Sequence, residues 1–273
     1  MDFIQKQIQL QFQGFLNTDF LWEHGTVLGI EQIKLSPKSN LVFNETLPEY
    51  LRLGKRVERF VSAELKAHND ISICCENIQI QKEKTTLGEI DCILKQKYST
   101  IHLEIVYKFY LYDPKVSNKE LLCWIGPNRR DSLIEKLHKL KDKQLPLLYS
   151  QYTKPILNKL KIPVETIKQQ VYFKAQLFVP FNYNKNIDFS GLNPKCVKGF
   201  YIHHTELNML DNCKFYITGK HNWLEEPSHQ VNWLSYHKFY KEIQIMALQK
   251  IAPMCWVKYP NGQIKKSFVV WWS

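Results

Sequence analysis

The stretch TLGEIDCILKQKYSTIHLEIVYKFYLY, from Thr86 to Tyr112, decides the fold class of this chain. Apolar and polar residues alternate on both sides of the short polar segment KQKYS at 95–99, a pattern typical of two β-strands joined by a turn. The first strand carries Asp91, and the second carries Glu104 and Lys108. Two carboxylates and a lysine on adjacent strands are a minimal set of side chains for holding Mg²⁺ against a phosphodiester.

Strand periodicity predicts which of these side chains share a face. Asp91 shares one face of its strand with Glu89, and Glu104 shares one face of the next strand with His102 and Lys108. If the strands pair with these faces together, Asp91 and Glu104 converge at one end of the sheet. Mg²⁺ takes oxygen ligands at about 2.0–2.1 Å, usually one or two carboxylates with waters and substrate phosphate. A nearby lysine could then position water or stabilise developing charge.

The remaining patterns indicate further strands and helices of an α/β protein. An apolar stripe beside Lys, Arg and Glu predicts a helix at 49–68, and alternation predicts strands at 71–81 and 169–181. A helix is expected to begin in NRRDSLIEKLHKLKDKQ, at 128–144. We also expect an N-terminal helix within 2–23, a helix at 235–251, and short strands at 199–204, 214–219, 252–259 and 267–273.

Composition limits the class of protein and its partners. The chain has 273 residues, 44% of them hydrophobic and 23% charged, which are globular values. Its net charge of +11 favours a polyanionic partner, either nucleic acid or an acidic membrane surface. No run approaches the roughly 18 apolar residues that a membrane-spanning helix needs. The seven cysteines contain no C-x-x-C pair, and the N-terminus lacks a signal-peptide pattern, so we expect a cytoplasmic protein without a membrane partner.

The order helix, three strands, helix, strand resembles the PD-(D/E)XK nuclease superfamily. GEID at 88–91 and the acid-to-lysine strand HLEIVYK at 102–108 carry that resemblance. An uncharacterised bacterial family placed in this superfamily is more closely similar, from about residue 20 to the C-terminus. The similar segments are LGKRVERF (53–60), HLEIVYKFYL (102–111), WIGPNRRDSLIEKLHKLKDKQLPLL (124–148) and KHNWL (220–224).

The resemblance implies a fold and a domain organisation. We expect an α/β fold with a restriction-endonuclease-like core, a mixed sheet of order α-β-β-β-α-β flanked by helices. The core is expected at 46–181, after a helical lead-in at 1–45. A C-terminal extension of short strands and one helix, packed on the core, is expected at 182–273, because the loop at 182–195 is rich in Asn, Gly and Pro.

The resemblance also implies roles for individual residues. Asp91 matches the metal-binding aspartate, Glu104 the second acid and Lys108 the lysine. Glu58 resembles the acid often found on the first helix, and Gln144 a polar residue that some relatives place near the phosphate. The cofactor implied is Mg²⁺ or Mn²⁺.

The spacing of acid and lysine departs from the superfamily pattern. Glu104 and Lys108 are four residues apart instead of two, so their Cα atoms are expected about 13 Å apart rather than about 7 Å. A bulge near Ile105 and Val106 could shorten that gap. The departure keeps a catalytically inactive, nuclease-like module among the hypotheses.

Ordinary structural explanations compete with each functional assignment. Asp91 and Glu104 could be charged residues on a solvated sheet face, Glu58 could form a helix-surface ion pair, and Lys108 could extend from a half-buried sheet. The basic stretch that contains Arg129, Arg130 and Lys136 could bind phosphate near a helix N-terminus or form a solvated helix face. The tryptophans at 223, 233, 256, 271 and 272 could stack on bases, but we expect them mostly in the core.

The sequence therefore predicts a metal-dependent nuclease that hydrolyses phosphodiester bonds of DNA or RNA. In this hypothesis Asp91 and Glu104 hold the metal, Lys108 assists water activation, and Glu58 takes part. Arg129, Arg130, Lys136 and Gln144 contact the nucleic acid. The alternatives are an inactive nucleic-acid-binding module of the same fold and a protein-interaction factor with a basic surface.

Overall fold

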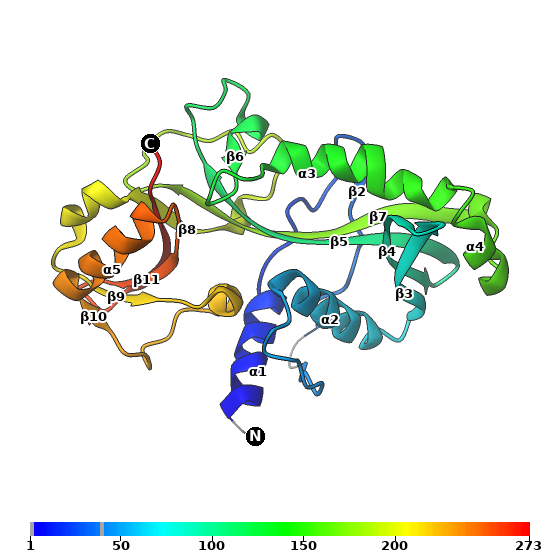
Figure 1. Ribbon diagram of the computed structural model, residues 1–273, viewed down its shortest axis with the longest axis horizontal. Helices are drawn as coiled ribbons and strands as arrows, with labels where there is room; N and C mark the ends of the chain where they lie inside the picture. The colour runs from blue at the N-terminus through cyan, green and yellow to red at the C-terminus, as the bar shows by residue number, and fades with distance from the viewer. Residues whose placement is uncertain (1–2, 39–40) are drawn as a thin grey trace. The chain divides into compact units, whose positions relative to one another are not determined.

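A computed structural model describes residues 3–38 and 41–273 of the chain, and it is an α/β protein with a large mixed sheet flanked by helices (Figure 1). The chain forms two compact units. Unit 1 contains the chain up to Asp19, Lys108–Ile134 and Ala175–Ser273, and unit 2 contains Phe20–Tyr107 and Glu135–Lys174. Each unit is thus assembled from segments that are distant in sequence. The consecutive domains expected from the sequence, with boundaries near 45 and 181, stay a prediction.

Unit 2 is built on an antiparallel meander of long strands. These are β3 (Ile71–Lys82), β4 (Thr85–Gln96) and β5 (Ser99–Tyr112), with β7 (Ile167–Pro180) beside β5. Gln96 pairs with Ser99, which leaves Lys97 and Tyr98 as a two-residue turn in which Lys97 has φ of 53°. The two central strands therefore meet through the turn that the sequence predicts, and the register is fixed locally.

Helices flank these strands on both faces (Figure 1). On one side lies α2 (Leu53–Lys66), which buries Val57, Phe60 and Leu65 completely or almost so. On the other side a continuous helical segment begins as α3 (Leu133–Lys139), passes through a π-helical turn, η2 (Leu140–Gln144), and ends as the 3₁₀ turn η3 (Leu145–Tyr149). The remaining elements of unit 2 are β1 (Thr26–Val27), β2 (Ile30–Glu31), α4 (Lys154–Leu160) and η4 (Val164–Thr166).

Unit 1 combines mostly short strands with two helices. Its helices are α1 (Phe3–Leu16) and α5 (Tyr236–Leu248), and its strands beyond the ends of β5 and β7 are β6 (Trp124–Ile125), β8 (Val197–His203), β9 (Lys214–Ile217), β10 (Leu234–Ser235), β11 (Met254–Lys258) and β12 (Ile264–Val270). Short 3₁₀ turns connect them: η1 (Glu120–Cys123), η5 (Pro194–Cys196), η6 (His204–Leu210) and η7 (Lys220–Leu224). Strand β8 is parallel to both β7 and β12, whereas β9, β11 and β12 pair antiparallel.

The helix expected to begin within 128–144 is present but is not a regular α-helix throughout. It begins at Leu133, because the preceding residues form a tight loop in which Gly126 N donates to Asp131 O at 2.7 Å and Arg129 has φ of 54°. Its second half is the π-helical turn, followed by a 3₁₀ turn that contains Pro146. In the described part of the chain, no helix is long and apolar enough to cross a membrane.

Candidate active site

The pairing of β4 with β5 brings Asp91 and Glu104 together. Ile93 lies opposite His102, and Cys92 lies opposite Leu103. Continued by one more residue, this register places Asp91 opposite Glu104, on the same face of the sheet as Ile93 and His102. Asp91 Oδ2 accepts a hydrogen bond from the backbone N of Ile105 at 2.8 Å. The two carboxyl groups thus sit on one face at the same position along the sheet, as the alternation predicts.

Glu104 is fully buried and is held by hydrogen bonds at both oxygens. His102 Nε2 lies 3.0 Å from Oε1, and Gln144 Nε2 donates to Oε2 at 2.5 Å. Gln169 Nε2 lies 3.1 Å from His102 Nδ1. If the Gln169 amide donates there, Nδ1 carries no proton and Nε2–H donates to Glu104. This chain of donors fixes the direction of the Glu104 side chain.

The environment of Asp91 disfavours its ionised form. Burial, and next the neighbouring Glu104 charge, raise its pKa to about 7. The hydrogen bond from Ile105 and the positive charge of Lys136 act the other way and offset only part of this effect. Two carboxylates thus face each other where water cannot screen them well, which is costly unless a cation occupies the site.

Lys136 and Gln144 reach this site from the helical segment after β6. Lys136 Nζ donates to Gln144 Oε1 at 2.6 Å, and the same amide donates to Glu104. Gln144 is the last residue of the π-helical turn, a feature that is frequent at functional sites. The structure therefore brings together two residues that the sequence suggested as nucleic-acid contacts and links them to the second acid.

Glu58, on α2, belongs to a group of charged side chains that also contains Lys55 and Glu89, and its charge acts on Asp91. Its pKa is raised mainly by burial, an effect that its ion pair with Lys55 only partly offsets, and the charges of Glu89 and Glu104 also raise it. Lys55 Nζ lies 2.8 Å from Glu58 Oε2 and 2.7 Å from Glu89 Oε1. With its amide nitrogen facing these acids, Asn77 Nδ2 lies 2.7 Å from Glu58 Oε2 and 3.0 Å from Glu89 Oε1. The surface ion pair weighed for Glu58 is thus present, yet Glu58 also faces the site.

Lys108, Arg129 and Arg130 lie in unit 1, whereas the carboxylates lie in unit 2. Lys108 Nζ donates to Asp131 Oδ2 at 2.6 Å, and its side chain is about one-third exposed. Arg129 pairs with the buried Asp113 and stacks 4.4 Å from the centre of the Trp272 ring. Arg130 is exposed.

Sequence reasoning missed several neighbours of the two acids. Lys55 and Asn77 carry no motif, although Lys55 precedes Glu58 by three residues, the spacing of a helical ion pair. Asn77 has φ of 55°, a conformation that asparagine adopts more readily than most residues, but the sequence does not reveal that conformation. Gln169 could not have been found without the pairing of β7, because it contacts His102 across 67 residues of sequence.

The donor set fits a hard divalent cation of the Mg²⁺ or Mn²⁺ type. Asp91 and Glu104 supply carboxylate oxygens, each with more than one lone pair, and Asp91 Oδ1 accepts no hydrogen bond from the described residues. A cation there would remove the repulsion that raises the pKa of Asp91. Across the described residues, no group of three or more His, Cys, Asp and Glu side chains is arranged as a metal site, so such an ion would rely on water and substrate for its other ligands.

Comparison with known proteins gives one match. A family model described as Domain of unknown function (DUF1853) matches residues 31–269, which is most of the chain. Neither the curated proteins nor the solved structures include a match to this chain.

Proposed function

The chain belongs to the DUF1853 family, and we propose from its own residues that it is a metal-dependent nuclease that hydrolyses phosphodiester bonds of DNA or RNA. The observation that carries the proposal is the pair of neighbouring carboxyl groups on adjacent strands, Asp91, which is half-buried, and Glu104, which is fully buried. Burial and mutual repulsion raise the pKa of Asp91 to about 7, which is a common property of catalytic and metal-binding groups.

A structural role explains this pair poorly. Buried carboxylates that only stabilise a fold are normally matched with cations, because an unmatched pair destabilises the folded state. Here Glu104 is instead held by the imidazole of His102 and the amide of Gln144, with no Lys or Arg bonded to it among the described residues. That arrangement keeps the carboxylate in place and leaves its charge available to an ion, as second-layer contacts do at metal centres.

Each residue has a distinct part in the proposed reaction. Asp91 and Glu104 hold Mg²⁺ or Mn²⁺, which when bound offsets charge on the phosphate and lowers the pKa of a coordinated water. Lys136, whose charge acts on Asp91, stabilises negative charge on the phosphate oxygens. Glu58 lies beside the acids and orients Lys55 through their ion pair. Lys108, which the acid-to-lysine pattern of the sequence indicates, remains the alternative to Lys136 as the lysine that assists the reaction.

The similarity to the PD-(D/E)XK superfamily supports this proposal. The meander of β3, β4 and β5 between α2 and α3, followed by β7, has the element order of that core. The acids Asp91 and Glu104 occupy its second and third strands, and Glu58 lies on the preceding helix. We propose on this basis that the fold is a PD-(D/E)XK-like core, elaborated by the strands of unit 1.

The test combines metal binding with cleavage on the same samples. Mg²⁺ and Mn²⁺ are titrated by calorimetry into wild type and into the Asp91→Ala/Glu104→Ala double variant, and each protein is assayed on mixed single- and double-stranded DNA and RNA. We expect wild type to bind metal and cleave, and the double variant to lose both. Cleavage that persists in the double variant would place the reaction elsewhere.

The second candidate, an inactive nucleic-acid-binding module, rests on the four-residue spacing of Glu104 and Lys108. It predicts no cleavage by wild type under any metal condition. It also predicts that Asp91→Ala leaves nucleic-acid affinity unchanged or raises it, since a negative charge is removed. If the protein is instead a protein-interaction factor, it should show no nucleic-acid binding that weakens with salt. The slope of log nucleic-acid affinity against log salt concentration therefore separates this hypothesis from the other two.

A further inference from the structure

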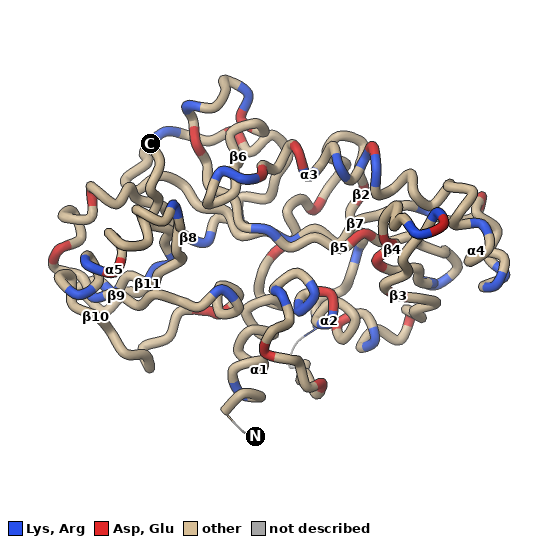
Figure 2. The backbone as a smooth tube through the Cα atoms, in the orientation of Figure 1, with Lys and Arg blue, Asp and Glu red and all other residues tan. Residues whose placement is uncertain are grey.

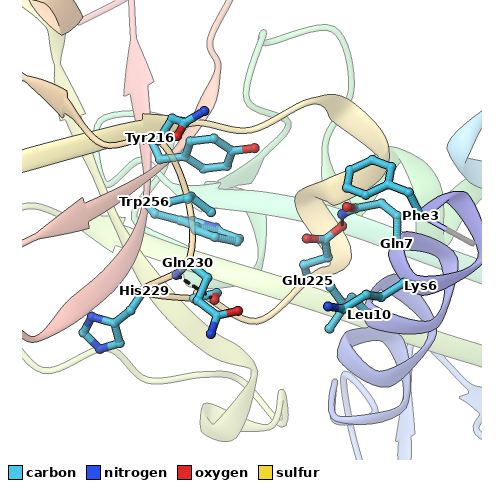
Figure 3. Close-up of a pocket in the computed structure, with 12 residues that line it drawn as sticks. Phe3, Lys6, Gln7, Leu10, Tyr216, Glu225, His229, Gln230 and Trp256 are labelled. Carbon is cyan, nitrogen blue, oxygen red and sulfur yellow. Dashed lines mark hydrogen bonds between the residues drawn. The ribbon is translucent and has the colours of Figure 1, made fainter.

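Unit 1 contains a pocket of about 530 Å³ between α1 and the strands β9 and β11. One wall is aromatic, formed by Tyr216 and Trp256, and the opposite wall carries Gln7 and Glu225 (Figure 3). Lys6, from α1, lies at the exposed rim. The volume is within the range of about 300–1,000 Å³ that small-molecule sites occupy.

The aromatic wall is the face of the small sheet that does not pack against α5. Residues on the other face, Phe215, Cys255 and Val257, form a core cluster with Phe239 and Ile243 of α5. Because side chains alternate along a strand, the rings of the intervening residues point to the opposite face.

Those intervening rings form a platform. Tyr216 and Trp256 are direct register partners on β9 and β11, and their ring centres are 5.1 Å apart with 47° between the planes. In Figure 3 both rings extend from the strands toward the side occupied by Glu225. Tyr216 is the more exposed of the two, so a flat ligand would stack mainly on its ring, beside the almost fully buried Trp256.

The polar wall is held rigidly by close packing of α1 against η7. A Cβ added at Gly14 would lie 2.0 Å from the carbonyl oxygen of Leu224, so the helix backbone meets this turn directly. The next residue, Glu225, is only 5% exposed and accepts a hydrogen bond from Gln7 Nε2. Burial raises its pKa to about 7, and the amides of Gln7 and Gln11 partly offset that effect. This wall therefore presents a carboxyl and a carboxamide in fixed positions.

The Trp256 side chain adds a donor without a partner. Trp256 is 2% exposed, and its Nε1 finds no hydrogen bond among the described residues. A ligand acceptor that reached this N–H would relieve the cost of the unmade hydrogen bond.

We propose that this pocket binds a nucleobase. A base has a flat π face for the Tyr216 and Trp256 rings and donors and acceptors along its edge for Glu225 and Gln7, and a phosphate attached to it would lie near Lys6. Binding of this kind needs neither metal nor cleavage, and it takes place in unit 1, whereas the carboxylates belong to unit 2. The base could belong to a single strand or to a free nucleotide, since both present the same ring.

The test measures binding in EDTA by fluorescence anisotropy, so that no cleavage interferes. The probes are short fluorescein-labelled homopolymers of dT and dA, and an abasic strand of the same length and charge. We expect wild type to bind the base-bearing strands more tightly than the abasic strand by about 5- to 150-fold, the effect of stacking one base. Tyr216→Ala should remove most of this preference.

Two further variants separate stacking from folding defects. Trp256→Phe keeps a ring in the wall but lacks the N–H donor, and we expect it to weaken binding by about 2- to 10-fold. Tyr98→Ala removes a fully exposed tyrosine in the hairpin turn of unit 2 and should leave binding unchanged. Circular dichroism and thermal melting check that each variant is folded.

Competition with free nucleoside monophosphates identifies the source of the base. Displacement of the strand by monophosphates supports a pocket for free nucleotides, and a preference for base-bearing strands without such displacement supports a base presented by a strand. Equal affinity for base-bearing and abasic strands, or full affinity in folded Tyr216→Ala, overturns the proposal. Neither result depends on whether the protein cleaves nucleic acid.

Discussion

The two compact units bury charge in opposite ways. In unit 1, Lys266 is 3% exposed, and its Nζ donates to Gln176 Oε1 at 3.0 Å. Burial lowers the pKa of Lys266 to about 8, while the nearby Glu225 acts to raise it, so this pair has opposite charges. In unit 2, the half-buried Asp91 lies beside the fully buried Glu104, and the charge of Glu104 disfavours ionisation of Asp91.

In unit 1 the fold supplies an opposite charge near its buried lysine, whereas in unit 2 it places two acids side by side. Lys and Arg are distributed over many segments of each unit (Figure 2), so the contrast lies in the buried residues and not in the surface composition. Unit 1 supplies the counter-charge for its buried lysine from its own chain. Unit 2 places a lysine, Lys136, near its acids but bonds it to the Gln144 amide. The remaining charge imbalance of unit 2 is the property that a bound cation would correct.

The largest expected effect concerns the two acids. Glu104→Gln and Asp91→Asn should each lower the rate of cleavage by on the order of 1,000-fold, the scale seen when a preorganised group at a reacting centre is removed. The measurement is the initial rate on a labelled oligonucleotide at saturating Mg²⁺.

A matched control tests whether burial alone explains that loss. Glu64 is a buried glutamate of the same unit that accepts a hydrogen bond from Tyr172 Oη and lies outside the site. Glu64→Gln keeps an acceptor there and should cleave close to the wild-type rate. Equal loss in Glu64→Gln and Glu104→Gln would mean that the like-charge pair has no special role.

The next largest effect is on stability in the absence of metal. The folded-state pKa of Asp91 is about 7, whereas an aspartate in an unfolded chain has a pKa of about 3.8, so the folded protein retains a proton that the unfolded chain releases. Stability should therefore fall as pH rises from about 4 through about 7, by on the order of 3 kcal/mol. Asp91→Asn should abolish most of this dependence, as measured by urea unfolding in EDTA at pH 4.5 and pH 8.

Adding Mg²⁺ to the same unfolding experiment tests whether a cation relieves the repulsion between the two acids. Mg²⁺ should raise the unfolding free energy of wild type at pH 8 and leave Asp91→Asn almost unchanged. A wild-type stability that is flat with pH, or equal gains from Mg²⁺ in both proteins, would contradict the repulsion on which the comparison of units depends.

The third prediction compares a lysine from each unit. Lys136→Met should lower the rate of cleavage by on the order of 100-fold, because it removes positive charge beside the acids, while leaving Mg²⁺ binding intact. Lys108→Met should have a smaller effect, since Lys108 bonds Asp131 within unit 1. Calorimetry and single-turnover rates measure the two quantities separately. A larger loss in Lys108→Met would restore the assignment made from strand spacing.

The smallest effects are expected at ion pairs that are exposed or partly exposed, where the units should not differ. Arg59 Nε lies 2.9 Å from Glu45 Oε2 in unit 2, and Lys198 Nζ lies 3.0 Å from Asp19 Oδ2 in unit 1. Arg59→Ala and Lys198→Ala should each change the free energy of unfolding by less than about 1 kcal/mol, as read from urea midpoints. A larger change in one unit would show that surface charge, and not only buried charge, distinguishes them.

Local patterns predicted the strands that carry the acids very well. Strands expected at 71–81, 86–95 and 100–112 are observed at Ile71–Lys82, Thr85–Gln96 and Ser99–Tyr112. The reason is that each meets its neighbour through a tight turn, so alternation and turn residues specify the pairing within a short stretch. The shared face of Asp91 and Glu104 follows from the same rule.

Contacts between distant segments could not be read in this way. Alternation along β5 places Lys108 on the face of Glu104 but does not reveal that Asp131 binds it, or that Lys136 comes to the acids from a helix. The segment after β6 has a helical apolar pattern, yet its π-helical turn depends on packing against β4 and on Pro146 ahead. The helix α4 was missed because its seven residues are too few for a periodic stripe.

The position of Gln144 at the site depends on the number of residues in the π-helical turn. A π turn holds more residues than an α turn, and successive residues of an α-helix are rotated by about 100°. Deleting one residue from Leu140–Gln144 would let the segment relax into a regular helix and turn Gln144 away from Glu104 by about that angle. Point changes at the exposed Lys141 or Lys143 leave this geometry intact. In descendants of this chain, the number of residues in this turn should therefore be more constrained than their identity.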